Sequence, residues 1–150
     1  MRHGDEGVAI AEWLITTLGS DLEVADALAL GPGEPASNRI WEGVAPEGTP
    51  WPVILFTIVD TNDVAAVGPG PRLVTNAVVD VKGVDEGETY ARLKPLARRL
   101  ADVLVGNHNE ALADGGLLLT CSRRSGIQYP DQAEGVQYRH LGATFAVLVQ

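Results

Sequence analysis

The stretch from Arg39 to Asp60, RIWEGVAPEGTPWPVILFTIVD, decides the fold. It predicts a short strand over Ile40–Glu42, a constrained turn over Ala45–Pro52 and a second strand over Val53–Val59. Prolines hold the turn extended, and Gly48 permits the chain to reverse there. Because the second strand is apolar at successive positions, we expect it to be central in a sheet and covered on both faces.

The residues before this stretch predict two helices. Apolar positions recur with helical spacing from Gly7 to Leu18, and a shorter pattern follows from Asp21 to Leu28, after Gly19 and a new polar cap. The segment Gly31–Pro35 then predicts an irregular loop, because its prolines lack donors and its glycines relax φ.

The residues after Asp60 predict three more strands and one long helix. We expect strands over Leu73–Lys82, Leu117–Arg123 and Val136–Val149. A capping pattern from Asp85 to Glu88 predicts the start of the helix, which ends near Val105. Pro95 lies inside that helix and predicts a bend or a loose first turn.

Polar segments separate these strands. Asn62–Arg72 and Ser125–Glu134 are expected to form projecting loops, and Asn107–Gly116 a polar connection. The sequence therefore predicts one α+β domain over residues 1–150, with a mostly antiparallel sheet of about four main strands and helices packed on one side.

The charge balance restricts the partners of the protein. The chain has 11 basic and 20 acidic side chains, and its formal net charge is −9. Binding to nucleic acid needs clustered Lys and Arg that neutralise phosphates, so this composition disfavours tight general binding. No run approaches the roughly 18 apolar residues that would span a bilayer, and the first residues, MRHGDEG, lack the apolar core of a signal peptide. We therefore expect no membrane partner.

The single cysteine, Cys121, cannot form an internal disulfide. It lies in the apolar run LLLTC, where a thiol is usually buried and behaves as a small apolar group. The sequence therefore predicts an unreactive thiol.

Asp60 and the Asp80-Val81-Lys82 triplet are the best candidates for chemistry. Two acids and a lysine on adjacent strands are the groups with which restriction-type nucleases hold Mg²⁺ and activate water. Asp80 and Lys82 point the same way from one strand, and Glu12 would complete the set. A solvated strand face gives the same spacing, so a Mg²⁺-dependent nuclease using Asp60, Asp80 and Lys82 stands as the alternative function.

Other polar motifs predict no catalytic or cofactor site. The three histidines lack metal-ligand spacing, and the Gly68–Pro71 segment lacks the N–H groups and the Lys-Ser/Thr of a phosphate-binding loop. The two arginine pairs, Arg98-Arg99 and Arg123-Arg124, either lie on a solvated helix face and strand end or contact a partner or DNA. Trp41 and Trp51 bracket the rigid turn, where tryptophan either packs the turn or anchors an interface.

The order of these elements resembles the tail-completion, or tail-terminator, family of long-tailed bacteriophages. The motif that carries the resemblance runs from Arg39 to Ile54, RIWEGVAPEGTPWPVI. It is followed by a hydrophilic loop, by Val79-Asp80-Val81-Lys82-Gly83 and by Tyr90-Ala91 near the helix start. Gly83 stands where the family usually has an aromatic residue, and the two Pro/Gly loops are longer than the family pattern.

The resemblance implies a structural virion protein and no enzyme or cofactor. Such a protein forms a ring of its own copies, a hexamer, that caps the tail tube, ends its polymerisation and joins the tail to the head connector. DNA then passes through the lumen without specific binding, and the protein resides at the head-proximal end of the tail after assembly in the host cytoplasm. The implied contacts with copies, tail tube protein and connector fall on these residues: Trp41, Trp51, Asn62, Asp63, Arg72, Arg123, Arg124 and Tyr129.

Overall fold

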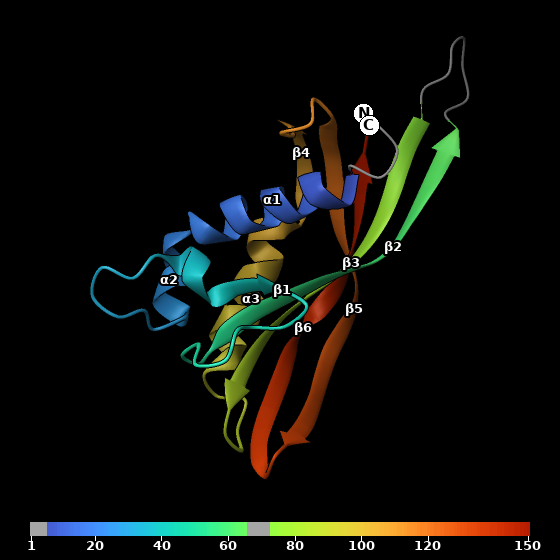
Figure 1. Cartoon of the computed structure of the whole chain (residues 1–150). Coiled ribbons are helices and arrows are strands. Elements are labelled where there is room, and N and C mark those ends of the chain that lie inside the picture. The colour runs from blue at the N-terminus through green and yellow to red at the C-terminus, as the bar shows by residue number, and fades with distance from the viewer. Residues whose placement is uncertain (1–5, 66–72) are drawn as a thin grey trace.

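A computed structural model describes residues 6–65 and 73–150. Its helices are α1 (Glu6–Gly19), α2 (Leu22–Ala27), the 3-10 helix η1 (Ala36–Arg39) and α3 (Leu93–Leu104). Its strands are β1 (Ile40–Glu42), β2 (Val53–Ala65), β3 (Leu73–Glu86), β4 (Gly106–Ala111), β5 (Leu117–Ala133) and β6 (Val136–Val149). The strands form one sheet in the order β1-β2-β3-β6-β5-β4 (Figure 1).

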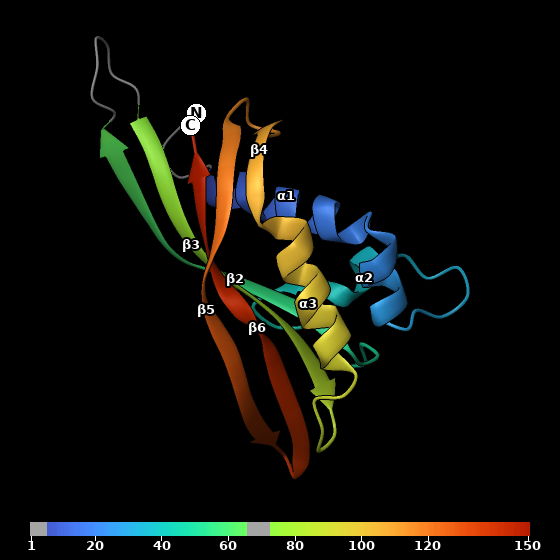
Figure 2. The same ribbon diagram turned by 180° about the vertical axis from the view of Figure 1, so that it is seen from behind.

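The sheet is mixed and larger than predicted. β1 runs parallel to β2, and every other neighbouring pair is antiparallel. The α+β class and the helices on one face are confirmed (Figures 1 and 2). The prediction of a mostly antiparallel sheet of about four main strands is confirmed only in part, because β1 and β4 join the four long strands to make six.

The core lies between the helices and one face of the sheet. Buried and half-buried side chains alternate over residues 74–82 of β3 and over residues 143–149 of β6, in agreement with the predicted alternation. The largest fully buried side chains come from both layers: Ile10, Leu14, Leu18, Leu28, Ile54, Phe56, Leu93, Leu96, Leu100, Leu104, Leu118 and Phe145. Within residues 6–65 and 73–150, the opposite face of the sheet carries no helix (Figure 2).

Two predicted loops are in fact strand. β2 continues through Ala65, so the expected loop from Asn62 begins as strand, and residues 66–72 lie outside the described ranges. The expected loop Ser125–Glu134 is the outer half of β5, which pairs with β6 to the tip of the hairpin. The polar sequence of these segments does not predict strands. They form strands because a neighbouring strand pairs with them, and not because of their intrinsic β propensity. The β5–β6 hairpin projects past the helices (Figure 1).

Strand β4 replaces the predicted polar connection at Asn107–Gly116. It pairs with β5 through four residue pairs around a bulge. The side chains of α1 fix it: the indole Nε1 of buried Trp13 donates to Glu110 Oε2 at 2.8 Å, and the Trp13 ring meets the His108 ring edge-on at 5.3 Å. Because these contacts join residues far apart in the sequence, the local sequence of β4 does not predict a strand.

Helix α3 begins later than predicted. Asp85 and Glu86 belong to β3, and Asp85 is buried with its carboxylate 3.6 Å from Arg92 Nη1. The helix begins at Leu93, so Pro95 falls in its first turn, where a missing N–H breaks no hydrogen bond of the helix. The predicted capping pattern is therefore wrong, and the expected effect of Pro95 is limited to the first turn.

Strand β2 is covered less than predicted. β1 pairs with it only from Ile54 to Phe56, and the last part of the strand extends beyond the helices (Figure 1). Ile54 and Phe56 are buried, but Val59 is 57% exposed at a bulge between Ile58 and Asp60. Only the first half of the strand is central.

The Arg39 side chain holds the turn before β2 in place. It is 4% exposed, and its Nη1 donates to the carbonyl oxygens of Leu28 and Pro52, each at 3.1 Å. Its Nε and Nη2 donate to the two carboxylate oxygens of Glu34. One guanidinium therefore joins the end of α2, the loop before η1 and the turn before β2.

The Cys121 thiol is buried, as predicted, and burial raises its pKa to about 12. Since the thiolate is the reactive form, the native protein is expected to leave Cys121 unlabelled by an exposed-thiol reagent at pH 8, while the urea-unfolded protein reacts fully. Labelling with and without urea, followed by mass spectrometry, checks this. Stoichiometric labelling of the native protein within minutes would contradict the burial.

Candidate subunit interface

The two tryptophans of the predicted interface lie beside the turn before β2. Trp41 is half-buried, and its indole Nε1 donates to the Asn38 carbonyl oxygen at 3.0 Å. Trp51 is half-buried against Tyr138 of β6, with ring centroids 5.1 Å apart. Both side chains therefore pack locally and keep part of their surface exposed.

Asn62 and Asp63 lie on β2, on the part of the strand that extends beyond β1. Both are exposed, and Asp63 accepts a hydrogen bond from Thr75 Oγ1 at 2.8 Å. Asn62 Nδ2 donates to Asp60 Oδ2 at 3.3 Å. Arg72, the third residue predicted in this segment, falls outside the described residues.

Arg123, Arg124 and Tyr129 lie on β5, at the opposite side of the sheet. The two arginines are exposed, and over the described ranges 6–65 and 73–150 neither has an ionic partner. Tyr129 is 39% exposed. Apart from the two tryptophans, the described residues of the predicted interface thus divide between β2 and β5, which flank the central strands β3 and β6.

Both strands have long edges that no other described strand covers. β1 covers β2 only opposite Ile54 to Phe56, and β4 covers β5 only as far as Cys121. From residue 57 on β2 and from residue 122 on β5, the outer edge of each strand faces solvent in the described part of the chain. Exposed edges present backbone donors and acceptors that another strand can pair with.

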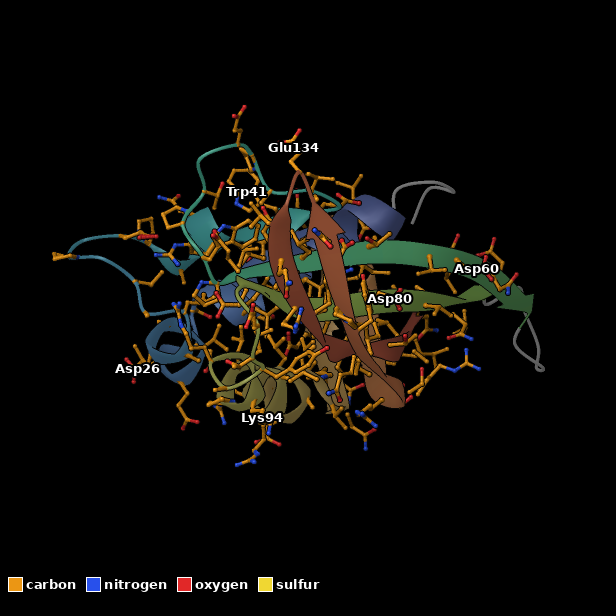
Figure 3. All side chains as sticks on the ribbon, turned by 90° about the horizontal axis from the view of Figure 1, so that it is seen from below. Asp26, Trp41, Asp60, Asp80, Lys94 and Glu134 are labelled. Carbon is orange, nitrogen blue, oxygen red and sulfur yellow. The ribbon has the colours of Figure 1, made fainter. Side chains whose placement is uncertain are left out.

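The nuclease candidates do not form a metal site. Asp80 Oδ1 accepts from Thr144 Oγ1 at 2.6 Å, whereas Asp60 binds Asn62 farther along β2 (Figure 3). Lys82 Nζ donates to the Tyr129 hydroxyl. No group of three or more His, Cys, Asp or Glu residues with metal-binding geometry exists among residues 6–65 and 73–150. The structure therefore gives the Mg²⁺-dependent nuclease no support.

A cluster on the helix-free face joins three strands and was not predicted. His140 stacks on Tyr129 with ring centroids 4.3 Å apart, and its Nε2 lies 3.5 Å from Asp131 Oδ2. The Lys82 ammonium lies 5.0 Å from the Tyr129 centroid. His140 is 7% exposed, and its Nδ1 has no hydrogen-bond partner among the described residues. Register alone brings these residues together, so sequence spacing could not reveal them.

Burial lowers the pKa of His140, the charge of Lys82 lowers it further, and Asp131 opposes both effects. The unfolded chain therefore binds a proton on His140 at a higher pH than the folded chain does. The free energy of unfolding is expected to fall as the pH drops from about 6.5 toward the lower folded pKa. Urea titrations at pH 7.5 and 5.5 measure this, and His140→Phe should reduce the difference. An unchanged difference in that variant would contradict the assignment.

One hollow near these edges lies at the β5–β6 hairpin. It has a volume of about 370 Å³ and is lined by Pro130, Asp131, Gln132, Gln137 and Arg139. Small-ligand sites are usually enclosed and mostly apolar, whereas this hollow is open and lined mainly by polar side chains. The exposed strand edges are the stronger candidate for a working surface.

Comparison with known proteins supports the fold. No family model and no curated protein matches the sequence. Among solved structures, the chain is similar to a chain of the "Virion of native gene transfer agent (GTA) particle", with a TM-score of 0.70 and 16% sequence identity. The match covers 99% of this chain and 100% of that chain. The two chains therefore share their fold over essentially their full lengths. In the described residues, no helix is long and apolar enough to cross a membrane.

Proposed function

We propose that this protein is a structural component of a virion and acts as the tail terminator. Copies of the chain form a hexameric ring that caps the tail tube, ends its polymerisation and meets the head connector. The observation that carries the proposal is the full-length similarity of fold to a chain of a virion particle. The motif from Arg39 to Ile54, which resembles tail-completion proteins, narrows the role within such a particle.

The two exposed edges of the sheet suit ring formation. A closed ring of identical copies needs heterologous contacts, in which one surface of each copy meets a different surface of the next. β2 and β5 supply two different edges on opposite sides of the central strands. Trp41 and Trp51 lie at the turn beside β1 and β2, where a tube protein or a connector would find aromatic anchors.

The helix-free face suits a channel that DNA crosses. In a ring with the helices outside, this face lines the lumen. Among the described residues, its side chains include Asp60, Asp80 and Asp131 together with the ammonium of Lys82. An excess of carboxylates repels phosphates, so DNA passes without specific binding. This proposal predicts no DNA cleavage and requires no cofactor.

The experiment for the proposed function mixes the purified chain with the tail tube protein of the same particle. The chain is expected to appear as a ring at tube ends in negative-stain images and to stop tube elongation in light scattering. A variant with Trp41→Ala and Trp51→Ala provides the matched test of the tube contact. Unrestricted tube growth with the wild-type chain at equimolar concentration, or tight binding of duplex DNA at low salt, would contradict the proposal.

A further inference from the structure

The exposed backbone groups on the two edges follow from the hydrogen-bond alternation of antiparallel strands. Leu117 and Gln150 exchange two hydrogen bonds of 2.8 Å, which fixes the alternation of pairs between β5 and β6. Counting back from Gln150, the even-numbered residues of β6 direct their backbone groups toward β5 and the odd-numbered residues, including Leu141, direct theirs away from it. Gln128, which lies opposite Leu141, therefore directs its N–H toward the outer edge of β5. By the same alternation, Gly126 also faces outward.

The β2 edge follows from the next strand pair. Gly87 N–H donates to the Gln137 carbonyl oxygen at 2.9 Å, which assigns the odd-numbered residues of β3 to pairs bonded with β6. The even-numbered residues of β3 therefore bond with β2. Thr61, opposite Ala77, and Ile58, opposite Val79, then direct their backbone groups outward.

One register between β2 of one copy and β5 of the next pairs these outward backbone groups. It also places side chains of the helix side opposite one another, and those of the helix-free side likewise. It places Asp63 opposite Arg123, Thr61 opposite Gly126 and Ile58 opposite Gln128. Each strand contributes one bulge, between Ile58 and Asp60 on β2 and between Arg123 and Ser125 on β5, and the two extra residues compensate each other. The strands run antiparallel, as neighbouring copies in a ring require.

The stagger of the two edges agrees with the tilt of a closed barrel. Within one copy, the row of directly opposite residues that starts at Asp60 on β2 passes through Val78 and Ala146 and ends at Ser122 on β5. In the proposed contact, Asp60 of a neighbouring copy lies opposite Ile127 of β5, whose partner in β6 is Gly142. The difference is 146 − 142 = 4 residues of β6, or roughly 14 Å at ~3.4 Å per residue. Four strands spaced ~4.8 Å apart are about 19 Å wide, so the strands would tilt by roughly 35°, within the range for barrels of about 35–45°.

The charges on the two edges are complementary. The β2 edge carries Asp60 and Asp63, and the β5 edge carries Arg123 and Arg124. In the register above, Asp63 lies opposite Arg123 on the helix side of the sheet, and Arg124 lies beside Asn62. Like charges meet if two β2 edges or two β5 edges pair, so the arrangement favours a heterologous contact over a two-fold one.

We propose that residues 57–63 of β2 in one copy pair with residues 123–129 of β5 in the next copy, continuing the sheet around the ring. This inference rests on the proposed ring and names its subunit contact. Pro130, opposite Arg139 in β6, would direct its N–H outward, but proline has none. Pro130 therefore marks the end of the β5 edge that a neighbouring strand can pair with. On β2 the available edge begins after Phe56, because β1 occupies the edge up to that residue.

Disulfide cross-linking tests the register. Asn62→Cys with Ser125→Cys places two exposed thiols directly opposite each other on the helix-free face, in a pair with Cα atoms about 4.5–5.5 Å apart. Thr61→Cys with Ser125→Cys is the matched control, because Thr61 points to the other face. Buried Cys121 does not compete. Mild oxidation at assembling concentrations should give a ladder of covalent oligomers for the first pair and only monomer for the control.

Proline substitution tests the backbone pairing separately. Gln128→Pro removes one N–H from the proposed contact while leaving the ladder with β6 complete, and Gln128→Thr keeps that N–H. Gln128→Pro is expected to raise the concentration of half-maximal assembly about threefold to tenfold, with unchanged urea unfolding of the monomer. Gln128→Thr should assemble like the wild type.

The outcomes separate the two proposals. Rings without cross-linked oligomers, or normal assembly of Gln128→Pro, would overturn the strand pairing and leave the ring function in place. Absence of rings and of cross-links in every variant, including in the presence of tube protein, would overturn both. Cross-links of equal yield in the Thr61→Cys control would overturn the register.

Discussion

Replacement of Arg39 by methionine is expected to lower the free energy of unfolding by about 2–6 kcal/mol, because two buried carbonyl oxygens would each lose their donor at about 1–3 kcal/mol apiece. The variant leaves the Leu28 and Pro52 carbonyl oxygens without their donor and Glu34 without its cation. Methionine preserves much of the apolar stem, so the loss reports mainly on the polar contacts. Urea unfolding followed by tryptophan fluorescence measures it.

Glu34→Gln is the matched control for this prediction. The Glu34 side chain is 19% exposed, so the amide can still accept from Arg39 and reach water. Since the guanidinium of Arg39 lowers the pKa of Glu34, the wild-type protein should lose part of this stabilisation as the pH falls below about 4.5, and Glu34→Gln should not. If Arg39→Met lowered the free energy of unfolding by no more than Glu34→Gln does, the result would contradict the conclusion that Arg39 holds the turn in place.

Gly142→Ala is expected to destabilise the fold by at least about 3 kcal/mol, the upper end of the usual cost of overpacking. A Cβ at this position would lie 2.2 Å from the Val81 carbonyl oxygen and 2.4 Å from Lys82 Cα, both of which are backbone atoms of β3. Backbone atoms cannot rotate away, so β3 and β6 would have to separate at the pair of Lys82 and Gly142.

Two other glycines provide graded controls for Gly142→Ala. A Cβ at Gly83 would meet the ends of the Leu96 and Leu93 side chains at 2.8 and 3.0 Å, so the expected cost is smaller. A Cβ at Gly126 would meet only Arg123 Nη2 at 2.9 Å, a flexible group on an exposed strand, and the change should be within about 0.5 kcal/mol. Thermal unfolding of the three variants ranks them. An order other than Gly142, Gly83, Gly126 would contradict the packing described here.

The sequence predicted the elements whose hydrophobic period is strong. Leu14 and Leu18 of α1, and Phe145 and Val147 of β6, are buried as their spacing indicated. The order of these elements and the helices on one face were also predictable, because each amphipathic element must bury its apolar side against another layer.

The elements that sequence reasoning missed are those that other strands hold in place. β4 and the outer half of β5 are polar, and their strands exist because β5 and β6 supply the hydrogen-bond partners. Asp85 has the local pattern of a helix cap, but its pairing opposite Arg139 places it in β3. Tertiary pairing overrides such short-range signals.

The candidate site shows the same division. Asn62, Asp63, Arg123 and Arg124 were predictable as exposed residues beside strands, but their arrangement on two opposite edges requires the strand order. Asp80 and Lys82 do share a strand face, as their spacing indicated. Their partners Thr144 and Tyr129 come from β6 and β5, which no spacing within the sequence could identify.

The most direct test of self-assembly is the mass of the purified chain over a range of concentrations, measured by mass photometry together with negative-stain imaging, alone and with tail tube protein. The monomer has a mass of 15.9 kDa, and six copies correspond to 6 × 15.9, or about 95 kDa. We expect closed rings of this mass, either in solution or on tube ends. A monomer at every concentration, with no ring on tubes, would contradict the account.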